Sequence, residues 1–166
     1  MTAAKNMLDK VLGALCIGLF GFLVLLVTWQ VVTRFVFNDP SVISEELAKY
    51  CFVWLVLFGA AYVFGEKGHM AIEFINDKFP GHTKTGADVL IEIVIILFAA
   101  LVLVVGGFKT TSLAWTQLSA ALQIPVGYLY AAMPVSGIFI IFYCVHNIYQ
   151  ILLKQKAGQH QVQEGS

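Results

Sequence analysis

A charged, turn-forming stretch in the first third of the chain reads Arg34-Phe35-Val36-Phe37-Asn38-Asp39-Pro40-Ser41-Val42-Ile43-Ser44-Glu45-Glu46-Leu47-Ala48-Lys49. The run before it, residues 11–33, contains no charged residue. A bilayer core about 30 Å thick is crossed by about 20 helical residues, so this run predicts a membrane span. Asn38-Asp39-Pro40 predicts a turn after that span.

The composition is that of a membrane protein, since 59% of the 166 residues are hydrophobic and only 12% are charged. An ionisable group at mid-bilayer costs at least about 2.5 to 3.5 kcal/mol, so the few charges should lie where spans end. Further uncharged runs predict spans at 47–64, 89–108 and 126–152, the last with a kink at Pro134. We therefore expect an all-α integral membrane protein with four transmembrane helices.

The domain organisation follows from these spans. Residues 1–156 form one four-helix membrane domain, and the polar residues 157–166 predict a disordered tail. The connections are expected to contain short interfacial helices, one at 70–79 within a polar hairpin and one at 110–123 that ends before Pro125.

The start of the second span carries helix-start signals. Ser44 is a candidate N-cap, and Glu45 and Glu46 in the first turn suit the positive end of the helix dipole. Glu45 precedes Lys49 by four residues, the favourable order for an ion pair on one helix face.

The basic residues predict the orientation, because cytoplasmic segments of membrane proteins are enriched in them. Four spans put both termini on one side, together with the middle hairpin. That side holds Lys5, Lys10, Lys67, Lys78, Lys84, Lys154 and Lys156, against Arg34, Lys49 and Lys109 on the other. Both termini are therefore expected in the cytoplasm and the stretch 34–49 outside.

Catalytic, metal and cofactor sites are not expected. The three cysteines are far apart within apolar runs, which argues against disulfides and zinc, and the four histidines do not face one another across spans as haem ligation requires. The zero net charge and the absence of a basic patch indicate no nucleic-acid partner.

Glu92 is the one carboxylate placed to serve as an intramembrane coupling site. The alternative interpretation, which we favour, is a near-interface carboxylate bonded within its own helix end or to a loop lysine. Small residues at Ala14, Gly18 and Gly21 predict close helix packing, within this domain or against a partner, and Gly59 is a further packing candidate.

Three segments in order resemble the small membrane subunit of tripartite ATP-independent periplasmic (TRAP) transporters. The first comprises Arg34 to Asn38, Ser44 to Tyr50, Trp54 and Gly59-Ala60-Ala61; the second is Lys67-Gly68-His69-Met70-Ala71-Ile72-Glu73; the third is Leu122-Gln123-Ile124-Pro125 with Tyr128, Tyr130 and Pro134. Two positions depart from the family pattern, since Ile43 stands where tryptophan is frequent and Lys49 where arginine is common.

The resemblance implies a scaffold subunit without a transport site of its own, in a bacterial inner membrane. Its implied partners are a large membrane subunit that carries the substrate and sodium sites and a periplasmic substrate-binding protein. Membrane lipid is a further expected partner. The implied substrates are organic acids of the C4-dicarboxylate or sialic acid class.

The resemblance also suggests roles for single residues. Contacts to a partner or a structural motif are expected at Arg34, Asn38, Ser44, Glu45, Glu46, Lys49, Trp54 and His69. For the charged residues of the outer stretch, a capped helix start with a snorkelling arginine is an equally good explanation. Two rival functions remain: a self-associating exporter or channel that uses Glu92 and Asp88, and a membrane anchor for a soluble enzyme.

Overall fold

The computed structural model describes the backbone of residues 2–67 and 82–163 and the side chains of residues 5–66 and 88–153. Four of its helical stretches are long and apolar enough to cross a membrane: Lys5–Phe35, Val42–Glu66, Asp88–Ala114 and Gly127–Leu153. The described residues contain no strand. The chain is therefore an all-α, multi-pass membrane protein, as the sequence predicts, and its first three spans are longer than the predicted ones.

The first two spans are α1, Thr2–Phe35, and α2, Val42–Lys67. The predicted turn lies between them. The backbone N–H of Val36 donates to the carbonyl of Val32 at 2.8 Å, and Asn38 then adopts a φ of 53°. Asparagine tolerates this left-handed conformation better than most residues, so it lets the chain reverse direction within residues 36–41.

The prediction that Ser44 caps α2 is wrong. The helix begins at Val42, and the backbone N–H of Ser44 donates to the hydroxyl of Ser41 at 3.4 Å. Ser41 is therefore the capping residue, and Ser44 lies buried in the first turn. Both serines offer a capping oxygen, but starting at Val42 adds a turn of backbone hydrogen bonds to the helix.

The third span is one continuous helix built from α4 (His82–Phe98), the π-helical segment η1 (Ala99–Gly106) and α5 (Gly107–Ala114). It extends past the predicted end at 108. The hydroxyls of Thr110 and Thr111 donate to the carbonyls of Gly106 and Gly107 at 2.9 and 2.7 Å. These polar side chains are thus satisfied within the helix and do not end it.

The prediction of an interfacial helix at 110–123 is therefore wrong. Residues 110–114 belong to α5, and the remaining residues lie in a loop that covers residues 115–126. In this loop Leu118 and Pro125 form an isolated antiparallel bridge, and the N–H of Val126 donates to the carbonyl of Gln117 at 2.8 Å. Gln123 turns the chain with a φ of 54°. The other predicted interfacial helix, at 70–79, lies outside the described residues, as does His69.

The fourth span consists of α6, Gly127–Tyr130, and α7, Ala132–Gln163. The break between the two helices falls at Ala131, three residues before Pro134. Proline has no backbone N–H to donate to the carbonyl of Tyr130, four residues earlier, so the interruption lies where a proline disturbs a helix. The predicted kink itself stays a prediction. The helix α7 also includes residues 157–163, for which the sequence predicted a tail.

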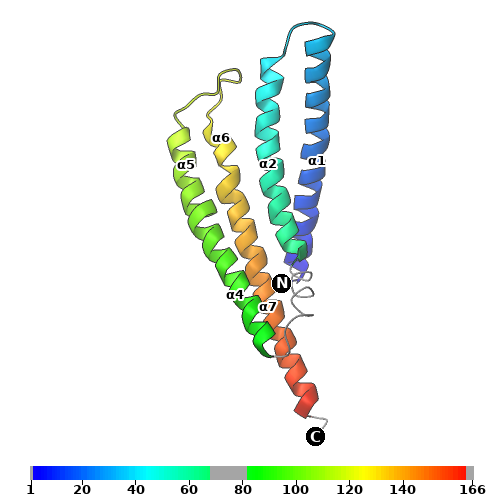
Figure 1. Cartoon of the computed structure of the whole chain (residues 1–166), viewed down its shortest axis with the longest axis vertical. Helices are drawn as coiled ribbons and strands as arrows, with labels where there is room; N and C mark the ends of the chain where they lie inside the picture. The colour runs from blue at the N-terminus through cyan, green and yellow to red at the C-terminus, as the bar shows by residue number, and fades with distance from the viewer. Residues whose placement is uncertain (1, 68–81, 164–166) are drawn as a thin grey trace.

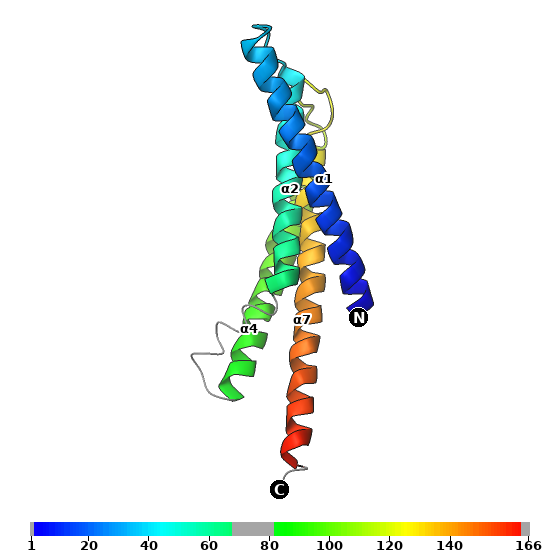
Figure 2. The ribbon, with the colours of Figure 1, turned by 90° about the vertical axis from the view of Figure 1, so that its right-hand side faces the viewer.

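The four spans lie side by side in a row (Figure 1). The helix α1 packs against α2, α2 against α7, and α7 against both α4 and η1. The loops 36–41 and 115–126 lie at one end of the row, here called the loop end, while both termini lie toward the opposite, terminal end (Figure 1). In the view turned by 90° the helices overlap toward the loop end and diverge toward the terminal end, where α1 and α4 lie on opposite sides of α7 (Figure 2).

Small residues let the middle helices approach closely. Ala61 of α2, Ala99 of η1 and Cys144 of α7 form one buried cluster with Ile140, while Leu12, Phe58 and Tyr143 join α1, α2 and α7 in another. A Cβ at Gly137 of α7 would lie 2.8 Å from the Cβ of Leu103. Within a membrane such close contacts supply the van der Waals packing that holds helices together.

The close approach at Gly137 predicts that alanine at this position destabilises the protein, whereas alanine at Gly18 does not. Gly137→Ala should overpack the α7–η1 contact and destabilise the chain by about 1 to 3 kcal/mol. Gly18→Ala is the matched control, since a Cβ at Gly18 meets no atom within 4 Å. Thermal unfolding in detergent should show a lower midpoint for Gly137→Ala only, and equal midpoints for the two variants would contradict this packing.

Candidate functional site

The loop end is organised by the carboxylate of Glu46, in the second turn of α2. It accepts hydrogen bonds from the backbone N–H groups of Ala120 at 3.1 Å and of Ala121 and Leu122 at 2.9 Å each. The hydroxyl of Ser119 also donates to it. A single side chain therefore holds the loop 115–126 against α2.

This arrangement is chemically favourable. Three successive N–H groups that converge on one point form a concave anion site, and hydrogen bonds to a charged acceptor are about twice as strong as neutral ones. The buried Ser119 closes the site, since its hydroxyl also accepts from the N–H of Leu122 at 3.2 Å. Glu46 thus stabilises a loop that has no regular secondary structure to satisfy its backbone.

A second link joins α2 to the start of the fourth span. The indole N–H of Trp54 donates to the backbone carbonyl of Tyr128 at 3.0 Å. Its ring packs edge-on against Phe58 with centroids 5.1 Å apart, and Trp115 packs against Tyr128 at the same separation. Glu46 therefore holds the loop 115–126 against α2, and Trp54 holds the start of α6, which directly follows that loop.

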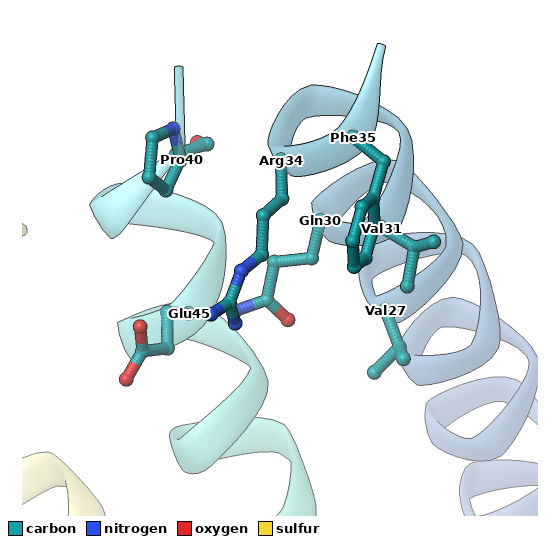
Figure 3. Close-up of a pocket in the computed structure, with 8 residues that line it drawn as sticks. Val27, Gln30, Val31, Arg34, Phe35, Pro40 and Glu45 are labelled. Carbon is teal, nitrogen blue, oxygen red and sulfur yellow. The ribbon is translucent and has the colours of Figure 1, made fainter. Parts of the chain in front are cut away.

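The predicted ion pair between Glu45 and Lys49 is confirmed, with 2.8 Å between the carboxylate oxygen and Nζ. Both side chains are more than half exposed, and such pairs contribute about 0 to 1 kcal/mol. Arg34 lies across the gap between α1 and α2 from Glu45 (Figure 3). The structure therefore gathers Arg34, Glu45 and Lys49 on the same side of the helix pair.

Glu92 does not bond within its own helix end. Its Oε1 accepts a hydrogen bond from the amide of Asn147, on α7, at 3.1 Å, a partner that the sequence did not indicate. A pair with a loop lysine stays a prediction, because those lysine side chains lie outside the described residues. Asn147 is buried and Glu92 is half-buried, and Asp88, one turn earlier, is buried as well. Glu92 therefore contributes to the contact between α4 and α7.

A polar cluster near the terminal end was not predicted. Asp9 of α1 pairs with Lys5 at 2.9 Å and accepts a hydrogen bond from the phenol of Tyr143, on α7, at 2.6 Å. Tyr143 is fully buried, and Gly65 of α2 packs on its ring. The spacing of Lys5 and Asp9 indicates their pairing, but no local signal points to a tyrosine in the fourth span.

The small-residue face of α1 is not used inside the domain. Ala14, Gly18 and Gly21 are exposed, and a Cβ at either glycine would meet no atom within 4 Å. A Cβ at Gly59 would likewise meet no atom within 4 Å. Of the two packing alternatives left open by the sequence, packing against a partner stays a prediction.

Metal and cofactor chemistry has no visible site in the described part of the chain. No group of three or more His, Cys, Asp or Glu side chains there is placed to hold a metal ion. The three cysteines are free, and Cys51 and Cys144 are buried.

The fold and these contacts define a multi-pass membrane protein whose intramembrane polar groups serve helix and loop contacts. Residues 23–154 match the family model of the DctQ component of tripartite ATP-independent periplasmic transporters. The chain therefore belongs to the family of small membrane subunits of TRAP transporters, as its three motif segments indicate.

Curated relatives agree with this assignment. The chain is 27% identical to the sialic acid TRAP transporter small permease protein SiaQ of Vibrio cholerae, over 89% of this chain and 85% of that protein. It is 26% identical to a putative TRAP transporter small permease protein of Haemophilus influenzae, over 84% and 86% of the two chains. It is also 31% identical to the sialic acid TRAP transporter permease protein SiaT of Haemophilus influenzae, over 82% of this chain but 22% of that protein.

The anion site predicts that Glu46→Gln releases the loop. The amide keeps an acceptor oxygen but loses the charge and presents its own N–H groups to backbone donors, at a cost of about 1 to 3 kcal/mol. Hydrogen exchange of the amides of residues 120–122 should become about tenfold faster or more. Glu45→Gln, which removes an adjacent exposed carboxylate, is the control, and equal exchange in both variants would refute the role of Glu46.

The terminal-end cluster predicts that Tyr143→Phe weakens the contact between α1 and α7. It leaves the carboxylate of Asp9 without its phenol donor, at a cost of about 1 to 3 kcal/mol. The control is Tyr149→Phe, an exposed tyrosine on the same helix. Thermal unfolding should distinguish the two variants, and a double-mutant cycle with Asp9→Asn should show that the effects are not additive.

Proposed function

We propose that this chain is the scaffold subunit of a sodium-coupled TRAP transporter for organic acids. It binds a large membrane subunit, which carries the transport sites, and supports the docking of a periplasmic substrate-binding protein. The substrate is an organic acid of the sialic acid or C4-dicarboxylate class, and the chain itself is not an enzyme.

The observation that carries this proposal is the use of three carboxylates in the helices. Glu92 is bonded to Asn147, Asp9 to Tyr143, and Glu46 to the loop 115–126. Each of these bonds joins two separate segments of the chain. Carboxylates committed to structure are what a scaffold needs, whereas a transporter acting alone needs ionisable groups free to bind its cargo.

The row of helices also favours a larger partner. A single layer leaves two wide apolar faces, and Ala14, Gly18 and Gly21 offer one of them a surface that a second helix can approach closely. The match to SiaT supports the same conclusion. Because that permease aligns with this chain over 22% of its length, it joins a domain of this kind to a much longer polypeptide.

The proposed location is the bacterial inner membrane, with both termini in the cytoplasm. The distribution of lysine and arginine supports this orientation, which places the loop end in the periplasm. The loops 36–41 and 115–126 then face the binding protein. Asn38 and Ser44 shape the first loop and its helix start, Glu46 holds the second loop, and Trp54 holds the start of α6 after it. His69 is proposed to lie on the cytoplasmic side.

The experiment that tests the proposal is co-isolation followed by reconstitution. The tagged chain, expressed with its neighbouring genes, should co-purify with a large multi-span protein. Liposomes that contain both should take up sialic acid or succinate only with a sodium gradient and the binding protein present. Recovery of this chain only with itself, or uptake by this chain alone, would contradict the scaffold function and favour an exporter that uses Glu92.

The role of the loop predicts a specific transport defect. Glu46→Gln should still co-purify with the large subunit but require a several-fold higher concentration of binding protein for half-maximal uptake, because the loop 115–126 loses its shape. Glu45→Gln should behave as wild type. A Glu46→Gln complex with unchanged dependence on the binding protein would show that the loop has no part in docking.

A further inference from the structure

A groove runs between α1 and α2 on the side where Arg34 lies (Figure 3). Two adjoining pockets form it and share Val27, Gln30 and Glu45 in their walls. The pocket nearer the loop end contains Arg34, and the deeper one contains Leu23 and Phe52. The groove is therefore charged at its entrance and apolar further along.

Arg34 lies in the last turn of α1, and side chains on a helix tilt toward its N-terminus. Its guanidinium accordingly extends back along α1 into the groove, toward Gln30 and Glu45 (Figure 3). Within residues 5–66 and 88–153 its side chain forms no ion pair or hydrogen bond. Glu45 is instead paired with Lys49 at 2.8 Å.

The charges that line the groove are Arg34, Glu45 and Lys49. Because Glu45 and Lys49 neutralise each other, one positive charge is left at the entrance. Below it, Leu23, Val27 and Phe52 line an apolar path, and Leu23 lies about 16 Å deeper than Arg34 at 1.5 Å of rise per residue. A cation above a narrow apolar path, at the edge of a membrane span, matches a molecule with an anionic head and a hydrocarbon chain.

We propose that this groove binds a phospholipid. Its phosphate lies against the guanidinium of Arg34 and the amide of Gln30, and one acyl chain follows Leu23, Val27 and Phe52. A guanidinium suits this role because its planar array of N–H donors matches phosphate oxygens. The pocket further from the loop end, about 270 Å³, has room for a stretch of hydrocarbon chain. The site is independent of the proposed transport function.

The test is lipid retention, measured by native mass spectrometry on the full chain purified in mild detergent, alone and with its co-purifying partner. The chain is incubated with phosphatidylglycerol or with diacylglycerol of the same acyl composition. Wild type should retain phosphatidylglycerol and not diacylglycerol. Arg34→Gln should reduce retention about tenfold, equivalent to about 1.4 kcal/mol, and Arg34→Lys should reduce it less.

Matched controls separate the groove from the rest of the surface. Lys109→Gln removes another exposed cation outside the groove and should leave retention unchanged. Val27→Trp fills the apolar path and should abolish retention, whereas Leu25→Trp, on the exposed outer side of α1, should not.

Three results would overturn the proposal: equal retention by Arg34→Gln and Lys109→Gln, retention of diacylglycerol as strong as that of phosphatidylglycerol, or retention by Val27→Trp at the wild-type level. A disulfide from Val27→Cys to a cysteine of another protein in the purified complex would place protein in the groove and overturn it as well.

Discussion

A carboxylate in a membrane protein must find donors inside the protein, because the hydrocarbon around it offers none. In this chain Glu46, Glu92 and Asp9 each accept a hydrogen bond from a partner far away in the sequence. Each carboxylate therefore ties two spans, or a span and a loop, to one another. The order of the helices in the row depends on these few polar bonds together with the small residues that let the helices approach.

The bond of Glu46 has consequences beyond its own helix. The loop 115–126 contains no charged residue, and the N–H groups of Ser119 and Val126 donate to the carbonyls of Ile124 and Gln117 across its base. These bonds join the two ends of the loop and leave the N–H groups of residues 120–122 at its tip without a carbonyl acceptor. The carboxylate supplies the missing acceptor for three successive N–H groups and thereby makes the loop a defined surface. A loop held in this way, beside the turn at Asn38, gives the loop end a fixed shape that a partner can recognise.

The arrangement in a row explains why a protein this small can act as part of an assembly. A closed bundle would bury most apolar side chains among its own helices, but a layer exposes them on both faces. Lipid and partner helices are then the natural neighbours. The groove at Arg34 and the small-residue face of α1 are two different sites on this exposed surface. The first suits the proposed lipid, and the second suits a partner helix.

Local sequence signals predicted several elements correctly. The turn at Asn38-Asp39-Pro40 and the ion pair between Glu45 and Lys49 follow from residues at most four positions apart, and hydropathy located all four spans. Local sequence signals gave the wrong prediction where the same residues allow two hydrogen-bonding arrangements. Ser41 and Ser44 both offer a cap, and Thr110 and Thr111 look like the start of an interfacial helix although their hydroxyls bond to the helix that contains them.

The sequence by itself determined the class of the protein, its four spans and its family, because hydrophobic length and short motifs depend on neighbouring residues. Only the tertiary structure decided what the polar residues do. Glu46 bonds to residues more than 70 positions away and Asp9 to one 134 positions away, and nothing near either carboxylate indicates those partners. A hydrogen bond across helices depends on which helices become neighbours, and packing between distant parts of the chain decides that.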